Sequence, residues 1–190
     1  MKTNILVLVG RNGVGKDFFA DTLCVSRGNV EKFCFGDAVK KYCIEAFPWI
    51  PKDCFYRNEL KDVVFEHPLN IQKLTPRQII HHISSSLQHI DPYIFTRKTL
   101  DEVNSSLKSV DCLHVITDMR IQREFQELQK IGRQCKVTYV RVVDVNAPQR
   151  PPVDKFEEWV DNFNQENFVF NNLKEGPEGV LRFVNRYKIC

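Results

Sequence analysis

The sequence predicts an α/β protein with a mostly parallel, five-stranded central sheet between two layers of helices, a three-layer αβα arrangement. Short apolar runs rich in β-branched residues alternate with longer amphipathic stretches, which is the pattern of βαβ units. The first apolar run leads through a glycine-rich turn into a helical stretch. The chain has 190 residues, of which 43% are hydrophobic, enough for one sizeable core, so we expect a single domain over residues 1–190.

The expected strands are the short apolar runs that turn residues bound. They comprise Asn4 to Val9, Lys32 to Phe35, Cys112 to Thr117, Lys136 to Val143 and Asn167 to Phe170. Helices are expected to fill most of the chain between them. Between the second and third strands we expect an inserted helical region over about residues 40–108.

Several helices carry their own start and stop signals. Thr75 offers an N-cap hydroxyl, Pro76 suits the first helical position, and Gln78 stands where a reciprocal cap belongs. Asp91-Pro92 repeats the cap-plus-proline pattern. The other expected boundaries are a helix from near Ile121 that Gly132 closes, a proline-containing loop from Asp144 to Pro152, and a final helix from Glu175 to Val184.

Charge and cysteine content exclude several classes of protein. There are 27 basic and 24 acidic residues, a net charge of +3, which is too small for a surface that coats nucleic acid but suits a small anionic partner. Seven cysteines without a CxxC pair favour free thiols in a reducing compartment. No apolar run approaches the length that spans a membrane. We therefore expect a soluble, cytoplasmic protein that binds neither nucleic acid nor a membrane.

The glycine-rich turn has the spacing of a phosphate-binding loop. Its residues are Gly10, Arg11, Asn12, Gly13, Val14, Gly15 and Lys16, between a strand and a helix. In this setting successive backbone N–H groups and the positive end of the helix dipole surround a polyphosphate, and Lys16 reaches its outer oxygens. The strand, the spacing, the lysine and the helix together predict nucleotide binding.

Asp17 occupies the position where such loops usually carry a serine or threonine that binds magnesium. Two interpretations of this residue are open. A carboxylate in the first turn of a helix is stabilised by the helix dipole by ~0.3–1 kcal/mol and needs no further role. Alternatively, Asp17 is a hard oxygen ligand that holds Mg²⁺ directly or through water.

A second acidic position follows the third expected strand, where Thr117-Asp118 ends the apolar run and Arg120 comes two residues later. Ligands of open α/β sheets bind beyond the carboxyl ends of the strands, so we expect Asp118 and Arg120 at the same edge as Lys16. Asp118 would then orient the metal ion or its waters, and Arg120 would neutralise charge on a transferred phosphoryl group. The alternative is an N-cap aspartate beside a solvated arginine.

Four further charged residues are candidates for binding an acceptor. Asp37 and Lys40 follow the second expected strand, one helical turn apart. Arg77 lies in the first turn of its helix, where its guanidinium joins the N-terminal amides, and Arg97 lies early in the helix after Asp91. Each could equally be a solvated helix charge, but together they could hold the second phosphate that transfer between two phosphorylated substrates requires.

Five segments resemble the deoxynucleoside monophosphate kinases of large bacteriophages in order and approximate spacing. They read GKDFFADTL, FCFGDAVKKY, LTPRQIIHHIS, DPYIFTRKTLDEV and VITDMRIQREFQELQKIG. The resemblance covers most of the chain from Ile5 to about Val143. It implies the P-loop kinase fold, ATP as donor, Mg²⁺ as cofactor, and transfer of the γ-phosphoryl group to a deoxynucleoside 5′-monophosphate.

The resemblance also implies roles for single residues. It places Asp37, Lys40 and Arg77 near the acceptor nucleotide, and Arg120 near the transferred phosphate. FVFNN followed by Gly176 is similar to the final strand and adenine-side loop of the family, which places Asn171 or Asn172 near the adenine. The family usually has threonine after the Lys-Asp pair, where this chain has Phe18, so the weight of metal binding shifts to Asp17 and Asp118.

Two other functions remain open at this stage. Phosphomevalonate kinase of the animal type shares a Gly-Lys-Asp-Phe loop, a DP-x-x-F-x-RK stretch aligned with Asp91 to Lys98, and an Asp-x-Arg after a strand. A nucleotide-binding switch without an acceptor is the third hypothesis, although the guanine-specifying Asn-Lys-x-Asp run is absent from the sequence. We expect small-molecule nucleotide partners and, for a phage protein, the host cytoplasm as location. A homodimer is one option for the assembly.

Overall fold

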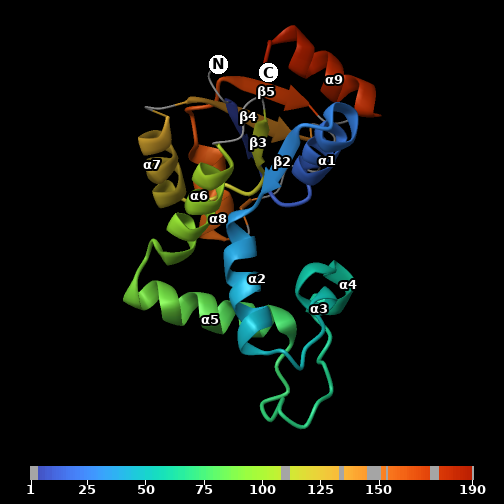
Figure 1. The fold of residues 1–190 in the computed structure, drawn as a ribbon, viewed down its shortest axis with the longest axis vertical. Coiled ribbons are helices and arrows are strands. Elements are labelled where there is room, and N and C mark those ends of the chain that lie inside the picture. The colour runs from blue at the N-terminus through green and yellow to red at the C-terminus, as the bar shows by residue number, and fades with distance from the viewer. Residues whose placement is uncertain are drawn as a thin grey trace. The chain divides into compact units, whose positions relative to one another are not determined.

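Five strands form one sheet in which all neighbouring strands are parallel (Figure 1). The computed structural model describes residues 4–107, 112–132, 135–144, 151–152, 154–171 and 176–189. Across the sheet the order is β2 (Val30–Phe33), β3 (Leu113–Ile116), β1 (Asn4–Val9), β4 (Lys136–Val143) and β5 (Phe168–Asn171). The predicted α/β class with a five-stranded parallel sheet is confirmed.

The central strand β1 pairs with β3 on one side and with β4 on the other. Its residues from Ile5 to Val9 are fully buried, because helices cover both faces of the sheet. A continuous apolar run of this kind is typical of parallel strands. Since the strands are parallel, the segments that follow β1, β3 and β4 leave the sheet at the same edge.

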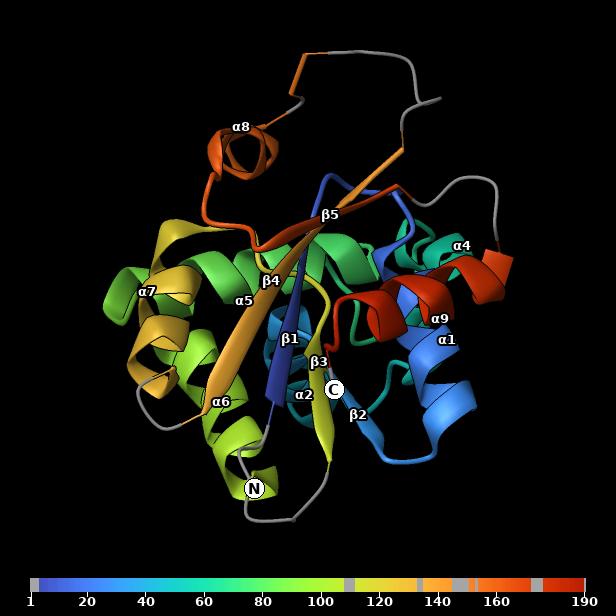
Figure 2. The same cartoon turned by 90° about the horizontal axis from the view of Figure 1, so that it is seen from above.

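Helices lie on both faces of the sheet (Figure 2). On one face α1 (Lys16–Arg27) and α9 (Gly176–Arg186) pack together, and they contribute Phe19, Leu23 and Val180 to a core shared with β1, β3, β4 and β5. On the other face lies α7 (Gln122–Ile131), whose Phe125 packs edge to face against Tyr139 of β4.

The chain divides into two compact units. Unit 1 is Met1–Cys34 with Leu100–Cys190 and contains the sheet and α8 (Lys155–Asn162). Unit 2 is Phe35–Thr99, and its described elements are all helical: α2 (Phe35–Ala46), α3 (Asp53–Tyr56), α4 (Asn58–Lys61), α5 (Pro76–Ile90) and the first part of α6 (Ile94–Ser106). Unit 2 has a core of its own, built around Ala38, Cys43, Phe55 and Ile79.

Most expected boundaries agree with the structure. The bounds of β1 and β4 are those predicted, and Thr75 and Gln78 form the predicted reciprocal cap of α5. The second strand was predicted too late, as Lys32 to Phe35. Val30 already pairs with Leu113 in the sheet, whereas Phe35 begins α2. Glu31 and Lys32 are polar, so this segment gains strand geometry from its neighbour β3 and not from its own pattern.

Two expectations about the whole chain can be compared with the described residues. All the cysteines among them are free thiols, namely Cys24, Cys34, Cys43, Cys54, Cys112 and Cys135. None of the described helices is long and apolar enough to cross a membrane.

Candidate functional site

The loop after β1 depends on glycine at defined positions. Gly10 is buried, and a Cβ atom there would lie 2.5 Å from the carbonyl oxygen of Val142. Gly13 and Gly15 adopt φ values of 80° and 91°, in the left-handed region that other residues rarely enter. The shape of this turn therefore depends on Gly13 and Gly15, which adopt positive φ values, and on Gly10, which allows β4 to approach closely.

Gly10→Ala is expected to destabilise unit 1 by about 1–3 kcal/mol, because the added methyl group meets backbone that cannot rotate away. Gly132→Ala is the matched control. At that position the nearest atom to an added Cβ lies at 3.4 Å, so its effect should remain below about 1 kcal/mol. Urea unfolding of both variants measures the difference, and equal costs would contradict the role of the Val142 approach.

Lys16 is buried at the first position of α1, and its ammonium group donates to the carbonyl oxygens of Gly10 at 2.9 Å and Arg11 at 2.7 Å. Burial, with a smaller contribution from the positive charge of Arg120, lowers the pKa of Lys16 to about 8. The carboxylates of Asp17, Asp118 and Glu157 act in the opposite direction. The charges of Arg120, Asp17, Asp118 and Glu157 therefore all lie within electrostatic range of Lys16.

Asp118 follows β3 and accepts a hydrogen bond from the thiol of Cys34, which follows β2, at 2.8 Å. It does not cap α7, whose N-cap residue is Ile121. The interpretation of Asp118 as an N-cap is therefore wrong. Its carboxylate instead lies at the carboxyl edge of the sheet, within electrostatic range of Lys16.

Asp17 lies on the exposed side of α1, and its carboxylate pairs with the ammonium group of Lys32 at 2.9 Å. Asp21, one turn later, pairs with the same ammonium group at 2.9 Å. The N-cap residue of α1 is Gly15, and no side-chain hydrogen bond caps this helix. Asp17 thus remains near enough to Lys16 to act on it, while Lys32 of β2 neutralises part of the acidic charge.

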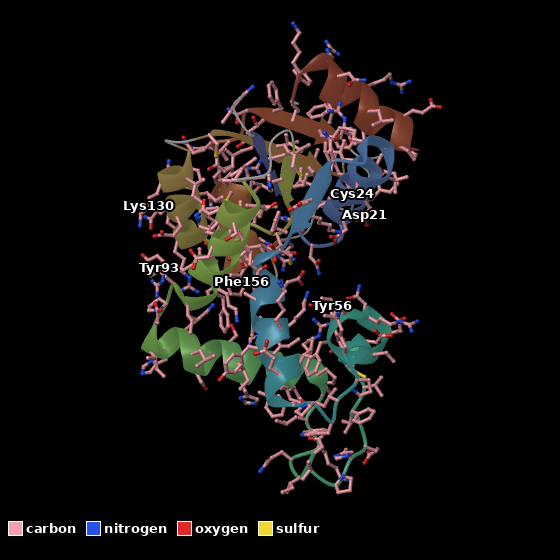
Figure 3. All side chains as sticks on the ribbon, in the orientation of Figure 1. Asp21, Cys24, Tyr56, Tyr93, Lys130 and Phe156 are labelled. Carbon is pink, nitrogen blue, oxygen red and sulfur yellow. The ribbon has the colours of Figure 1, made fainter. Side chains whose placement is uncertain are left out.

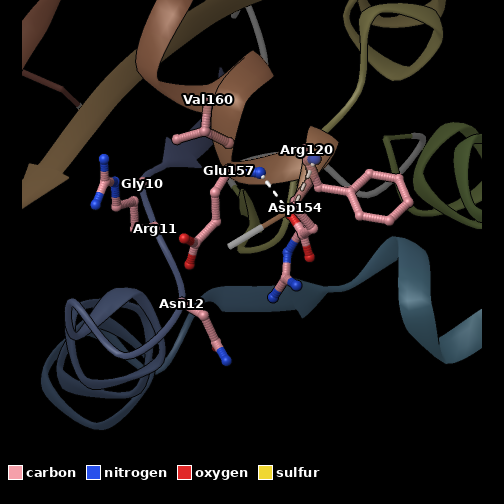
Figure 4. A pocket seen from close by; sticks show the side chains of 8 residues that line it. Gly10, Arg11, Asn12, Arg120, Asp154, Glu157 and Val160 are labelled. Atoms are coloured by element: carbon pink, nitrogen blue, oxygen red, sulfur yellow. Dashed lines mark hydrogen bonds between the residues drawn. The ribbon is translucent and has the colours of Figure 1, made fainter. Parts of the chain in front are cut away.

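A pocket opens in front of the loop, and α8 forms its other wall (Figure 4). Arg11 forms a two-bonded ion pair with Asp161, at 2.8 and 2.5 Å, which ties the loop to α8. Glu157 is buried in this wall, and Figure 4 shows its side chain extending toward the loop. The lining residues are Gly10, Arg11, Asn12, Arg120, Asp154, Phe156, Glu157 and Val160.

The backbone beside Arg120 is held by Glu124. Its carboxyl oxygen accepts from the backbone N–H of Arg120 at 2.7 Å and from that of Ile121 at 3.2 Å. Burial raises the pKa of Glu124 to about 8, and the negative charge of Asp118 adds to this effect. Glu124 therefore fixes the segment that presents Arg120 while holding a proton at neutral pH.

Glu124→Gln is expected to flatten the pH dependence of stability. The folded-state pKa of about 8 lies above the ordinary value of 4.5, so between these pH values the folded protein holds a proton that the unfolded chain has lost. The contribution of this group to stability is present below about pH 4.5 and is lost as pH rises toward 8. Free energies of unfolding measured across this window should fall more steeply for the wild type, and identical slopes would refute the assignment.

In unit 2, Asp37 and Lys40 form an ion pair of 2.7 Å within α2. The ammonium group of Lys40 also lies 4.8 Å from the ring centre of Tyr56, which Figure 3 shows on α3. An ammonium group over an aromatic face is a favourable contact. The ammonium group of Lys40 therefore contacts both the carboxylate of Asp37 and the aromatic ring of Tyr56.

The two other acceptor candidates are also held by carboxylates of unit 2. Arg77 binds both oxygens of Asp62, at 2.6 and 2.9 Å, and Arg97 pairs with Asp91. Among the described ion pairs, Lys40, Arg77 and Arg97 each pair with a different carboxylate, so no shared partner brings the three basic side chains together. Asn171 is the last residue of β5 and is exposed at the carboxyl edge of unit 1, whereas Asn172 lies outside the described residues.

Sequence reasoning missed several members of the site. Glu157 stands three residues after Asp154, which caps α8 through the backbone N–H groups of Phe156 and Glu157. This cap-and-acid pattern was a usable signal for a helix start. Nothing in the local sequence around Lys32 or Cys34 marks them, because their partners are distant in the chain: Asp17 lies in α1 and Asp118 follows β3.

A glycine loop around a buried lysine, at the carboxyl edge of a parallel sheet, defines a P-loop protein. No family model and no curated protein matches the chain. Among solved structures, dephospho-CoA kinase from Campylobacter jejuni is similar with a TM-score of 0.55 and 11% identity, covering 97% of each chain.

Two further solved structures are similar to this chain. The tunicamycin resistance protein of Deinococcus radiodurans has a TM-score of 0.52 and 12% identity, over 98% of this chain and 96% of the other. A sugar kinase from Janibacter has a TM-score of 0.51 and 10% identity, over 100% and 96%. The chain therefore has the P-loop kinase fold.

Proposed function

We propose that this protein transfers the γ-phosphoryl group of ATP to a deoxynucleoside 5′-monophosphate and so forms the diphosphate. The observation that carries the proposal is the charge arrangement around Lys16: a buried ammonium group on the glycine loop, with Asp118 and Arg120 within electrostatic range. The P-loop kinase fold of the solved structures supports phosphoryl transfer in general. The choice of acceptor rests on the sequence segments that resemble the phage enzymes.

On the donor side, Lys16 and the backbone N–H groups from Gly10 to Gly15 bind the phosphates of ATP, and Asn171 lies near the adenine. Arg120 offsets the charge that develops on the transferred group. The carboxylates of Asp17 and Asp118 fit Mg²⁺, because both offer hard oxygen atoms and both act on Lys16. The bound ion would neutralise phosphate charge, and these two residues would hold it through water.

On the acceptor side, Asp37, Lys40, Arg77 and Arg97 bind the nucleoside monophosphate. Each of the three basic groups is paired with a carboxylate in the structure, namely Lys40 with Asp37, Arg77 with Asp62 and Arg97 with Asp91. An incoming phosphate would compete for these guanidinium and ammonium groups, which are matched to its oxygens. The transfer is direct and in line, so catalysis comes from positioning and charge stabilisation.

The test is an acceptor panel. The purified protein is incubated with ATP, Mg²⁺ and one of dAMP, dCMP, dGMP, dTMP or phosphomevalonate, and ADP release and the phosphorylated product are measured. Product from a deoxynucleotide supports the proposal, while product from phosphomevalonate alone replaces the acceptor. ATP binding without acceptor-dependent ADP would favour a nucleotide-binding switch.

A further inference from the structure

Three side chains with different donor atoms meet on one face of the sheet in unit 1. They are Glu31 of β2, His114 of β3 and Cys112, which directly precedes β3. Glu31 and His114 are direct partners in the β2–β3 register, and Cys112 is two residues before His114, so strand alternation places all three on the same face. Their donor atoms lie within 4.8 Å of one another.

We propose that Glu31, Cys112 and His114 bind a transition-metal ion of the zinc type, with a fourth position for water. A thiolate, an imidazole and a carboxylate are the donors that Zn²⁺ takes in tetrahedral sites, whereas Mg²⁺ prefers oxygen atoms alone. The site is separate from the nucleotide loop. Cys112 precedes β3, at the amino end of the strand, whereas Asp118 follows its carboxyl end.

The distances allow coordination after small rotations. His114 Nε2 lies 4.0 Å from Glu31 Oε2, and tetrahedral zinc requires about 3.3–3.5 Å between a nitrogen and an oxygen donor. The imidazole is fully buried and stacks on Phe33, so its direction is fixed. The side chain of Glu31 is 49% exposed and is able to move toward it.

The hydroxyl group of Ser106, at the end of α6, contacts two of the three proposed ligands. It lies 2.9 Å from His114 Nε2 and also donates to the carboxylate of Glu31. A metal ion bound by Glu31 and His114 would therefore lie close to this oxygen. Ser106 would then rotate away and leave the fourth position to water.

The local charge favours a cation. Among the described residues, His114 is the only basic side chain within ion-pair distance of Glu31. Burial raises the pKa of the Cys112 thiol, and the negative charge of Glu31 raises it further. When the ion binds, the S–H bond breaks, a sulfur–metal bond forms and the proton passes to solvent, so binding should tighten as pH rises.

The experiment uses the full chain after chelator treatment and dialysis, titrated with Co²⁺ as a spectroscopic substitute for Zn²⁺. One equivalent should produce the near-ultraviolet charge-transfer band of a cobalt–thiolate bond, and Zn²⁺ should remove it. Cys112→Ser should abolish the band. Cys34→Ser is the matched control, because that thiol also lies beside a carboxylate, that of Asp118, and its loss should leave the band unchanged.

A second variant and a second measurement keep the test decisive if Cys112→Ser folds poorly. Glu31→Gln changes an exposed side chain and should weaken Zn²⁺ binding more than about tenfold. Substitution of residues that only hydrogen-bond to a metal ligand already reduces metal affinity by about tenfold or more. Zn²⁺ should raise the melting temperature of the wild type more than that of Glu31→Gln. Absence of the band, its loss in Cys34→Ser, or equal metal binding by wild type and Glu31→Gln would overturn the proposal.

Discussion

Lys16→Met is expected to reduce turnover by at least about 10²–10³-fold while the fold stays intact. The ammonium group belongs to the glycine loop itself, and the carbonyl oxygens of Gly10 and Arg11 already hold it in position. Methionine keeps most of the buried apolar stem and removes the charge. Burial of that charge lowers its pKa to about 8, which means that burial disfavours the charged form, so the variant should be as stable as the wild type or more stable.

The measurement combines steady-state ADP release, with the acceptor found in the panel, and urea unfolding of the same samples. Lys130→Met provides the control, because Lys130 is exposed on α7 and pairs with Glu127, three residues earlier on the same helix. Its turnover should match that of the wild type. Full activity in Lys16→Met, or an equal loss in Lys130→Met, would show that the loop does not serve the reaction.

Arg120→Ala is expected to lower kcat by about 10³-fold or more and to change the KM for ATP much less. The side chain lines the pocket in front of the loop and acts electrostatically on Lys16, so it is placed to stabilise charge that grows during transfer. Arg120→Lys should recover only part of the rate, because a compact ammonium group lacks the planar set of donors that guanidinium offers to phosphate oxygens.

Arg27→Ala is the matched control for Arg120→Ala. Arg27 lies in the last turn of α1, at the other end of the helix from Lys16, and its guanidinium donates to Asn185. Its kinetics should be those of the wild type. If Arg120→Ala raised the KM for ATP with kcat unchanged, Arg120 would serve ground-state binding and not the transfer step.

Several elements of both units could be predicted because their signals are local. The β1 run and the glycines after it determine a strand, a turn and a helix over adjacent residues, and Thr75 with Gln78 determines the start of α5 in the same way. The parallel sheet also predicted that Asp118 and Arg120 would lie at the same edge as Lys16, and in the structure both residues act electrostatically on Lys16. The roles assigned to these residues stay predictions.

The contacts that could not be predicted join residues that are far apart in the sequence. Lys32 reaches Asp17 and Asp21 only because β2 lies next to α1, and Arg11 reaches Asp161 only because α8 packs before the loop. The convergence of Glu31, Cys112 and His114 likewise requires the β2–β3 register.

By itself, then, the sequence determined the parallel α/β class, the phosphate-binding loop and the N-terminal cap of α5, since each arises from residues a few positions apart. Only the tertiary structure decided that Asp118 bonds to Cys34 and caps no helix, that Glu124 supports Arg120 from a buried position, and that Glu157 lies in the wall of the loop's pocket. Burial, and contacts between segments that are far apart in the chain, arise only when the elements pack. Local sequence patterns do not show which surfaces will come into contact.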